Sequence, residues 1–187
     1  MTGMLQMLGR GAIVICVVAV SATTGYAKSD LCRQYVDNKE YDRAIEECSR
    51  MMTVSTYSAD EAYNNRGIAY AGKKQYDQAV ADYSRAIGLA PVFDKAYTNR
   101  GNAYWHLGLF EKSFADYQTA INLNPDDPNA YYNVACRHAL RKNEKDACAW
   151  LKKAVEKGFT QWDYIRKDSD LEGIRNAPCY KEILSGK

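Results

Sequence analysis

The sequence predicts an all-α solenoid, a fold built from stacked helical hairpins. The first observation is a 34-residue period: residues 60–93 align with residues 94–127 without a gap, and 15 of the 34 positions are identical. The second is a helical spacing of aromatic and small residues within each copy, closed by a proline. A fixed period of this size is the signature of stacked supersecondary units. Such arrays present long surfaces to partners, so the period favours binding over catalysis.

Each copy predicts two amphipathic helices with a polar break between them. In the first copy, the residues that share a face of the first helix are Tyr63, Arg66, Gly67 and Tyr70, spaced three and four apart. A break at residues 72–74 follows. The second helix carries Ala79, Tyr83, Ala86 and Ile87 on one face and ends at Pro91. Small residues allow the two helices to approach closely, and tyrosines fill the space beside them.

This pattern resembles the tetratricopeptide repeat family, whose first helix reads Trp-x2-Leu-Gly-x2-Tyr. The two copies read Tyr63-x2-Arg66-Gly67-x2-Tyr70 and Tyr97-x2-Arg100-Gly101-x2-Tyr104, and the later small, aromatic, small and proline positions are Ala79, Tyr83, Ala86 and Pro91, then Ser113, Tyr117, Ala120 and Pro125. The resemblance implies repeats at 60–93 and 94–127, degenerate repeats at 28–59 and 128–161, and capping helices at 162–187. The fold it implies is a superhelix of about four hairpins.

The chain departs from the family where Arg66 and Arg100 replace the usual leucine. Asp82 and Asp116 each lie 16 residues further on, across the same hairpin. In the fourth unit, both corresponding positions are apolar. We therefore predict two structural salt bridges, Arg66–Asp82 and Arg100–Asp116, because an unpaired charge there would be costly.

Residues 1–27 read as a secretory signal peptide cleaved after Ala27. They hold one charge, an apolar run at 12–20 and a small polar stretch before Ala27. An uncleaved anchor is the alternative, but a spanning helix needs about 20 apolar residues. Cleavage changes the formal charge from +2 to +1. A nearly neutral chain gives no indication of nucleic-acid binding, and the leader predicts a periplasmic or secreted protein.

Five cysteines remain after that cleavage, so at least one has no partner within the chain. Cys32 and Cys48 fall on the two halves of the first predicted hairpin, and we expect them to form a disulfide. Cys148 faces the C-terminal segment, so Cys148–Cys179 is the second expected pair, with Cys136–Cys148 as its competitor. Export makes disulfides permissible.

The resemblance implies that the first helices line a concave groove for a partner protein or peptide. The groove residues it points to are Asn64, Asn65, Ile68, Lys95, Thr98, Asn99, Asn102, Trp105, His106, Asn129, Tyr132 and Asn133, with Glu61 and Cys136 on the same face. Asparagine can donate and accept, which suits the main chain of an extended peptide. Trp105 and Tyr132 are expected anchors, since large aromatic residues are enriched at binding hot spots.

Two alternatives bear on this surface. Some family members bind a C-terminal carboxylate with a clamp of Lys, Asn and Arg, but Asn133 stands in the place of the Arg and Ile68 replaces an Asn, so that specificity is not carried over. The second alternative concerns Asn65, Asn99 and Asn133, which recur every 34 residues. They either contact a partner or hydrogen-bond between neighbouring helices.

Catalytic and metal motifs are weak. The chain has only two histidines, His106 and His138, and no nucleophile, zinc-protease or phosphate-loop motif. Cys136, His138 and Cys148 could in principle bind zinc, but His138 occupies a position where the other copies have a packed tyrosine. We expect no cofactor, no metal and no enzyme activity.

The sequence therefore predicts a non-enzymatic protein-binding adaptor of a bacterial cell envelope. One alternative is a holdase chaperone for exported chains, which would bind many unfolded clients. A Cys-rich helical-repeat enzyme is the other, although the spacing of the cysteines is not regular.

Overall fold

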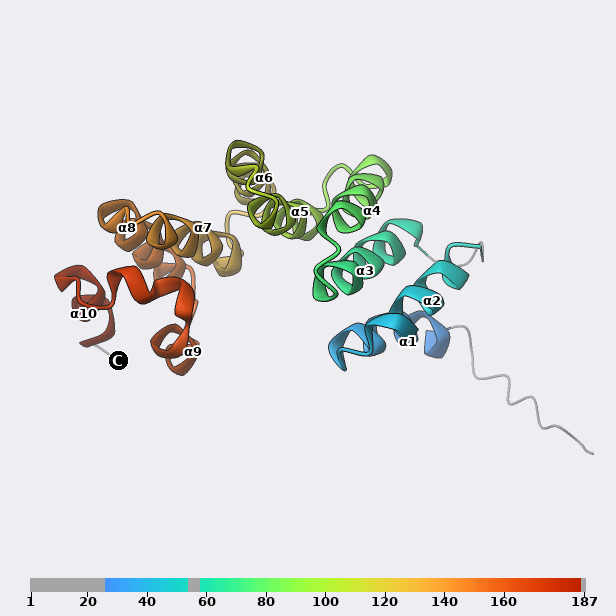
Figure 1. The fold of residues 1–187 in the computed structure, drawn as a ribbon, viewed down its shortest axis with the longest axis horizontal. Helices are drawn as coiled ribbons and strands as arrows, with labels where there is room; N and C mark the ends of the chain where they lie inside the picture. The colour runs from blue at the N-terminus through green and yellow to red at the C-terminus, as the bar shows by residue number, and fades with distance from the viewer. Residues whose placement is uncertain (1–25, 54–57, 186–187) are drawn as a thin grey trace, which may run out of the picture.

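The computed structural model describes residues 26–53 and 58–185, and this part of the chain is helical without strands. Four hairpins stack in chain order into a curved array (Figure 1). They are α1 (Tyr26–Asp37) with α2 (Tyr41–Met51), α3 (Ala59–Gly72) with α4 (Tyr76–Leu89), α5 (Asp94–His106) with α6 (Phe110–Leu123), and α7 (Pro128–Leu140) with α8 (Glu144–Glu156). The predicted all-α solenoid is confirmed.

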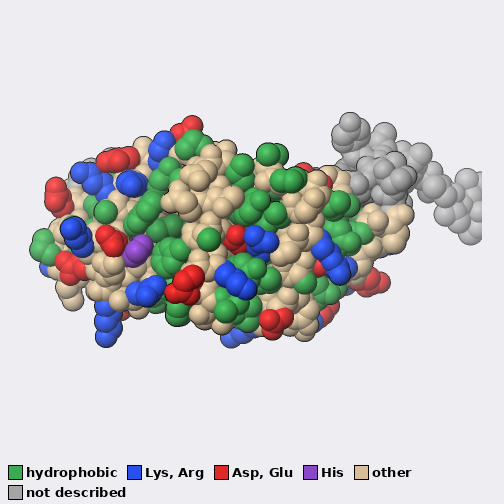
Figure 2. All heavy atoms as spheres, turned by 90° about the horizontal axis from the view of Figure 1, so that it is seen from above, with side chains coloured by type: hydrophobic (Ala, Val, Ile, Leu, Met, Phe, Trp, Pro, Cys, Tyr) green, Lys and Arg blue, Asp and Glu red, His purple; other side chains and the backbone are tan. Residues whose placement is uncertain are grey.

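The predicted signal peptide lies outside the described residues apart from Tyr26 and Ala27, which begin α1. Its cleavage stays a prediction. No helix in the described part is long and apolar enough to cross a membrane. The face seen in Figure 2 mixes basic and acidic side chains without a large area of one sign, as the formal charge of +2 leads one to expect.

The turn inside each hairpin places one residue in the left-handed backbone region. These residues are Lys39, Lys74, Gly108 and Lys142, with φ between 58° and 73°. A non-glycine residue pays a steric penalty there, yet three of the four turns use lysine. All three lysines are exposed, and each follows the C-terminal end of a helix, where a cation is favoured.

Close approach of the two helices in each central hairpin depends on a glycine. A Cβ at Gly67 would lie 2.6 Å from Tyr83 Cε1, and one at Gly101 would lie 2.8 Å from Tyr117 Cε1. Both tyrosines are almost fully buried. Any side chain larger than hydrogen would therefore displace a core tyrosine, which explains why this position is glycine in both copies.

The first hairpin fills the same position with a disulfide. Cys32 and Cys48 are bonded, with their Cα atoms 5.1 Å apart, and both are fully buried. They are 16 residues apart, as are Gly67 and Tyr83 in the next hairpin. A covalent bond thus replaces the glycine–tyrosine contact in the first hairpin of the described array.

The two predicted salt bridges cross the central hairpins. Arg66 donates to both carboxylate oxygens of Asp82, at 2.7 Å and 2.8 Å. Arg100 does the same with Asp116, at 2.8 Å to each oxygen. Both aspartates are buried, and hydrogen bonding to Asp82 raises the pKa of Arg66 above its usual value. These are paired, bidentate contacts inside the array rather than surface ion pairs.

Three short helices close the C-terminal end: α9 (Trp162–Lys167), the 3-10 helix η1 (Ser169–Ile174) and α10 (Pro178–Ser185). Ile165, Leu171 and Ile174 from this segment join the core of the last hairpin. Cys148 on α8 and Cys179 on α10 are bonded, with Cα atoms 6.1 Å apart. Cys136 is buried and unpaired, so the competing Cys136–Cys148 bond does not form.

We predict that Cys32→Ala with Cys48→Ala lowers the free energy of unfolding by about 3 kcal/mol, because the closed loop of about 16 residues no longer restrains the unfolded chain. Denaturant unfolding followed by circular dichroism measures the change. The variant Cys148→Ala/Cys179→Ala retains only the first disulfide, so dithiothreitol should destabilise it by a similar amount. An unchanged unfolding midpoint in both experiments contradicts the prediction.

We predict that Asp116→Ala costs about 3 kcal/mol of stability, because it leaves the Arg100 guanidinium partly buried without its partner. The double variant Arg100→Leu/Asp116→Leu should recover at least half of that loss, since the fourth hairpin fills the same two positions with Val134 and Trp150. Denaturant unfolding of both variants provides the comparison. Equal losses in the two would show that the aspartate acts by something other than charge pairing.

Candidate functional site: a polar groove on the inner face

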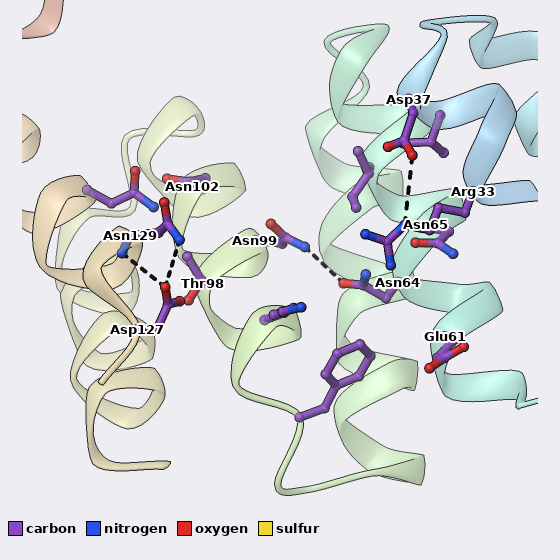
Figure 3. A pocket seen from close by; sticks show the side chains of 15 residues that line it. Arg33, Asp37, Glu61, Asn64, Asn65, Thr98, Asn99, Asn102, Asp127 and Asn129 are labelled. Carbon is purple, nitrogen blue, oxygen red and sulfur yellow. Dashed lines mark hydrogen bonds and ion pairs between the residues drawn. The ribbon is translucent and has the colours of Figure 1, made fainter. Parts of the chain in front are cut away.

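The first helices of the hairpins line a cavity of about 490 Å³ on the inner side of the array (Figure 3). Four helices or their first residues contribute to it, and its lining is polar. The lining residues are Arg33, Val36, Asp37, Glu61, Asn64, Asn65, Ile68, Phe93, Lys95, Thr98, Asn99, Asn102, Asp127, Asn129 and Asn133. We call this cavity the groove.

Most of the residues expected in the groove do line it. Those that do are Asn64, Asn65, Ile68, Lys95, Thr98, Asn99, Asn102, Asn129 and Asn133, together with Glu61. Trp105, His106 and Tyr132 do not line it, nor does Cys136. The residues that miss the groove include both of the expected aromatic anchors.

Tyr132 is not available to a partner, so its expected role as an anchor is wrong. The residue is only 4% exposed. Its ring stacks on Phe159 with centroids 4.1 Å apart, and its hydroxyl donates to Asp168 Oδ2 at 2.6 Å. Burial raises the pKa of this hydroxyl. The chain's own C-terminal segment covers the inner face of α7 here, which the repeat pattern alone does not indicate.

Cys136, one turn further along α7, is covered by the same segment. It is 2% exposed, and its thiol lies 3.7 Å from Asp168 Oδ2. Burial raises the pKa of the thiol, and the Asp168 carboxylate adds to the rise. The neutral thiol is therefore favoured, and Cys136 behaves as a core residue.

Neighbouring aromatic rings pack against Trp105 and His106. The Trp105 ring contacts Phe110 at a centroid distance of 4.6 Å and lies beneath the Arg137 guanidinium at 5.2 Å. His106 stacks on Tyr76, with centroids 4.5 Å apart. Partial burial lowers the pKa of His106, and the charge of Arg137 lowers it further. The neutral imidazole is favoured at this position, in a smaller hollow beside the groove.

The contribution of α1 to the groove was not predicted from the sequence. Arg33, Val36 and Asp37 line the groove, and an ion pair of 3.8 Å joins Arg33 to Asp37. The signal was available: the first unit is offset from the second by 35 residues, not 34, which aligns Arg33 with Ile68 and with Asn102 of the third unit. A single extra residue between the first two units hid this alignment.

The recurring asparagines divide into two kinds. Asn99 donates from Nδ2 to Asn64 Oδ1 at 3.0 Å, which joins α5 to α3 (Figure 3). Asn102 accepts from the Tyr117 hydroxyl at 2.7 Å. Asn65 and Asn133 have no side-chain hydrogen bond to any residue in the described part. Both expected roles therefore occur in the row Asn65, Asn99 and Asn133. Asn99 links two helices, while the amides of Asn65 and Asn133 remain free to contact a partner.

A zinc site from Cys136, His138 and Cys148 does not form. Cys148 is consumed by its disulfide, and the His138 ring packs against Phe114 with centroids 5.1 Å apart. Within residues 26–53 and 58–185, no group of three or more His, Cys, Asp or Glu side chains is placed to hold a metal ion.

The hairpins and their inner groove define a tetratricopeptide-type solenoid. The tetratricopeptide repeat family model matches residues 60–93 and 94–127, so the central part of the chain carries two repeats of this family. A comparison with curated proteins finds no match.

Solved structures with the same fold include a crystal structure of MamA, which is 27% identical over 74% of this chain and 81% of that chain, with a TM-score of 0.61. The second TPR domain of human RPAP3, solved in complex with the HSP70 peptide SGPTIEEVD, is 25% identical over 70% of this chain and 93% of that chain, with a TM-score of 0.50. The first TPR of Spaghetti (RPAP3), bound to the HSP90 peptide SRMEEVD, is 24% identical over 70% and 90%, with a TM-score of 0.51.

We predict that alanine substitution of two adjacent asparagines of α3 has different effects on stability. Asn64→Ala should lower the free energy of unfolding by about 1–2 kcal/mol, because it leaves the inward amide of Asn99 without its acceptor. Asn65→Ala should change stability by no more than about 0.5 kcal/mol, since its amide has no partner to lose. Denaturant unfolding of the two variants measures the difference. Equal effects would mean that the Asn64–Asn99 bond contributes nothing to stacking.

Proposed function

We propose that this protein is a non-enzymatic adaptor that binds an extended segment of a partner protein in the groove. The observation that carries the proposal is the polar cavity formed jointly by the four hairpins. Unbonded amides at Asn65 and Asn133 offer donors and acceptors to the main chain of such a segment. The complex of the similar RPAP3 domain with a peptide is consistent with it.

The proposed location is a bacterial cell envelope, in the periplasm or outside the cell. Two disulfides support an oxidising compartment, and the predicted leader supports export. No cofactor, metal or nucleic acid enters the proposal.

The lining favours an adaptor over a general holdase. Val36, Ile68 and Phe93 are the apolar residues of the groove, scattered among amides and charges. A holdase that binds many unfolded chains needs a continuous apolar surface. An adaptor that recognises one polar segment needs spaced hydrogen-bonding groups, which this lining supplies.

We predict that Asn65→Ala with Asn133→Ala abolishes partner binding while leaving the fold intact, because neither amide is used internally. A photo-reactive amino acid at position 68, introduced into the parent and into this double variant in the native organism, followed by mass spectrometry, measures binding. The parent should give one or a few crosslinked proteins.

The matched control is Gln118→Ala/Asn122→Ala on α6, which removes two exposed amides that bond only to each other. It should crosslink like the parent. Crosslinks to many unrelated proteins would favour the holdase. Crosslinks that survive the Asn65→Ala/Asn133→Ala change would contradict binding through the groove amides.

A further inference from the structure

The charged residues of the groove are not equivalent, because most of them already have partners. Arg33 and Asp37 form an ion pair with each other. Asp127 accepts from the backbone N–H of Asn129 at 3.0 Å and from its side-chain amide at 2.7 Å, as the cap of α7. Glu61 and Lys95 differ: both are exposed, and neither has an ion pair or hydrogen bond within the described residues.

Glu61 and Lys95 occupy the same position of successive repeats, 34 residues apart, and Asn129 occupies it in the next. Along the groove this row therefore carries a negative charge at α3, a positive charge at α5 and a neutral amide at α7. The groove also contains the row Asn65, Asn99 and Asn133, four positions further along each helix. A chain bound to the amides thus runs beside a row whose charge changes sign.

We infer, given the proposed function, that the bound segment is an extended peptide of balanced charge. It presents a basic side chain to Glu61 and an acidic side chain to Lys95, about three residues apart. Packed helices lie roughly 8–10 Å from one another, and an extended chain advances about 3.3 Å per residue. One repeat therefore corresponds to about three residues of the partner.

This partner differs in charge from an acidic tail. The charged lining residues comprise two cations and three anions, so the groove has no excess of positive charge to attract several carboxylates. A partner that places a charge of the same sign opposite Glu61 or Lys95 is repelled, and such repulsion is how charges at the rim of an interface confer specificity. Because the Debye length is about 8 Å at physiological ionic strength, each charge acts mainly on the side chain directly opposite it.

The test is a selection of random twelve-residue peptides displayed on phage against the purified protein, followed by anisotropy titrations of the best peptide. We expect enrichment of a Lys or Arg three residues from an Asp or Glu, in one sequence order. Glu61→Lys or Lys95→Glu should weaken that peptide two- to fivefold, the range of an exposed ion pair. Reversing the corresponding charge on the peptide should restore its affinity.

Glu111→Lys on α6 and Lys145→Glu on α8 are the matched controls, since both residues are exposed and lie outside the groove. Neither should change affinity. The peptide SRMEEVD is the acidic comparison and should bind more weakly than the selected peptide. The inference is overturned if SRMEEVD binds more tightly than the selected peptide. It is also overturned if neither Glu61→Lys nor Lys95→Glu changes the affinity for the selected peptide.

The outcomes also separate this inference from the proposed function. Peptides that lose binding on Asn65→Ala/Asn133→Ala but carry no opposite charges would overturn the charge pattern and leave groove binding standing. Peptides that bind that double variant unchanged, or a selection that enriches none, would contradict the proposed function itself.

Discussion

Each central repeat is held together by one guanidinium group that contacts three helices. Arg66 on α3 binds Asp82 on α4 through two hydrogen bonds and donates from Nη1 to Ser49 on α2 at 2.8 Å. One repeat later, Arg100 binds Asp116 and donates to Ser84 at 3.0 Å. The same side chain therefore fixes the two helices of its hairpin and joins them to the preceding hairpin.

The tyrosines of the repeat signature complete this arrangement. The guanidinium of Arg66 lies over the rings of Tyr63 and Tyr70, at 5.5 Å and 5.8 Å from their centroids. The face of an aromatic ring attracts a cation, and arginine keeps its planar donor fork while stacking. Burial of the charge is tolerated because each of the three guanidinium nitrogens donates a hydrogen bond. The position of the inner helices, and with it the groove, depends on this contact.

Fold prediction succeeded where local and repeat signals agree. The glycine, tyrosine and arginine positions recur at one period, and each has a packing role that sequence spacing alone defines. The Cys32–Cys48 pair was predictable as well, because the two cysteines fall on the two halves of the first hairpin. These are contacts within a hairpin, where chain geometry determines which residues meet.

The site was less predictable because it depends on contacts between distant segments. Tyr132 has a groove position in the repeat, but residues 159–168 fold back over it. Trp105 lies on the expected helix, yet rings from α6 hold it. No period relates these segments. Arg33 was hidden for a simpler reason, the extra residue that breaks the 34-residue alignment before the second unit.

Residues 159–168 cover part of α7, and this makes the two ends of the groove different. At the α1 end, the lining side chains of Arg33 and Asp37 are about two-thirds exposed. At the other end, Asp168 and Asp170 already accept hydrogen bonds from Tyr132 and Arg137. The carboxylates of the chain itself thus occupy the place where a bound segment would continue. The Cys148–Cys179 disulfide attaches the C-terminal segment, which carries these carboxylates, to α8. A segment bound in the groove would therefore meet, beside Asn133, a surface of α7 that the chain's own C-terminal residues already cover.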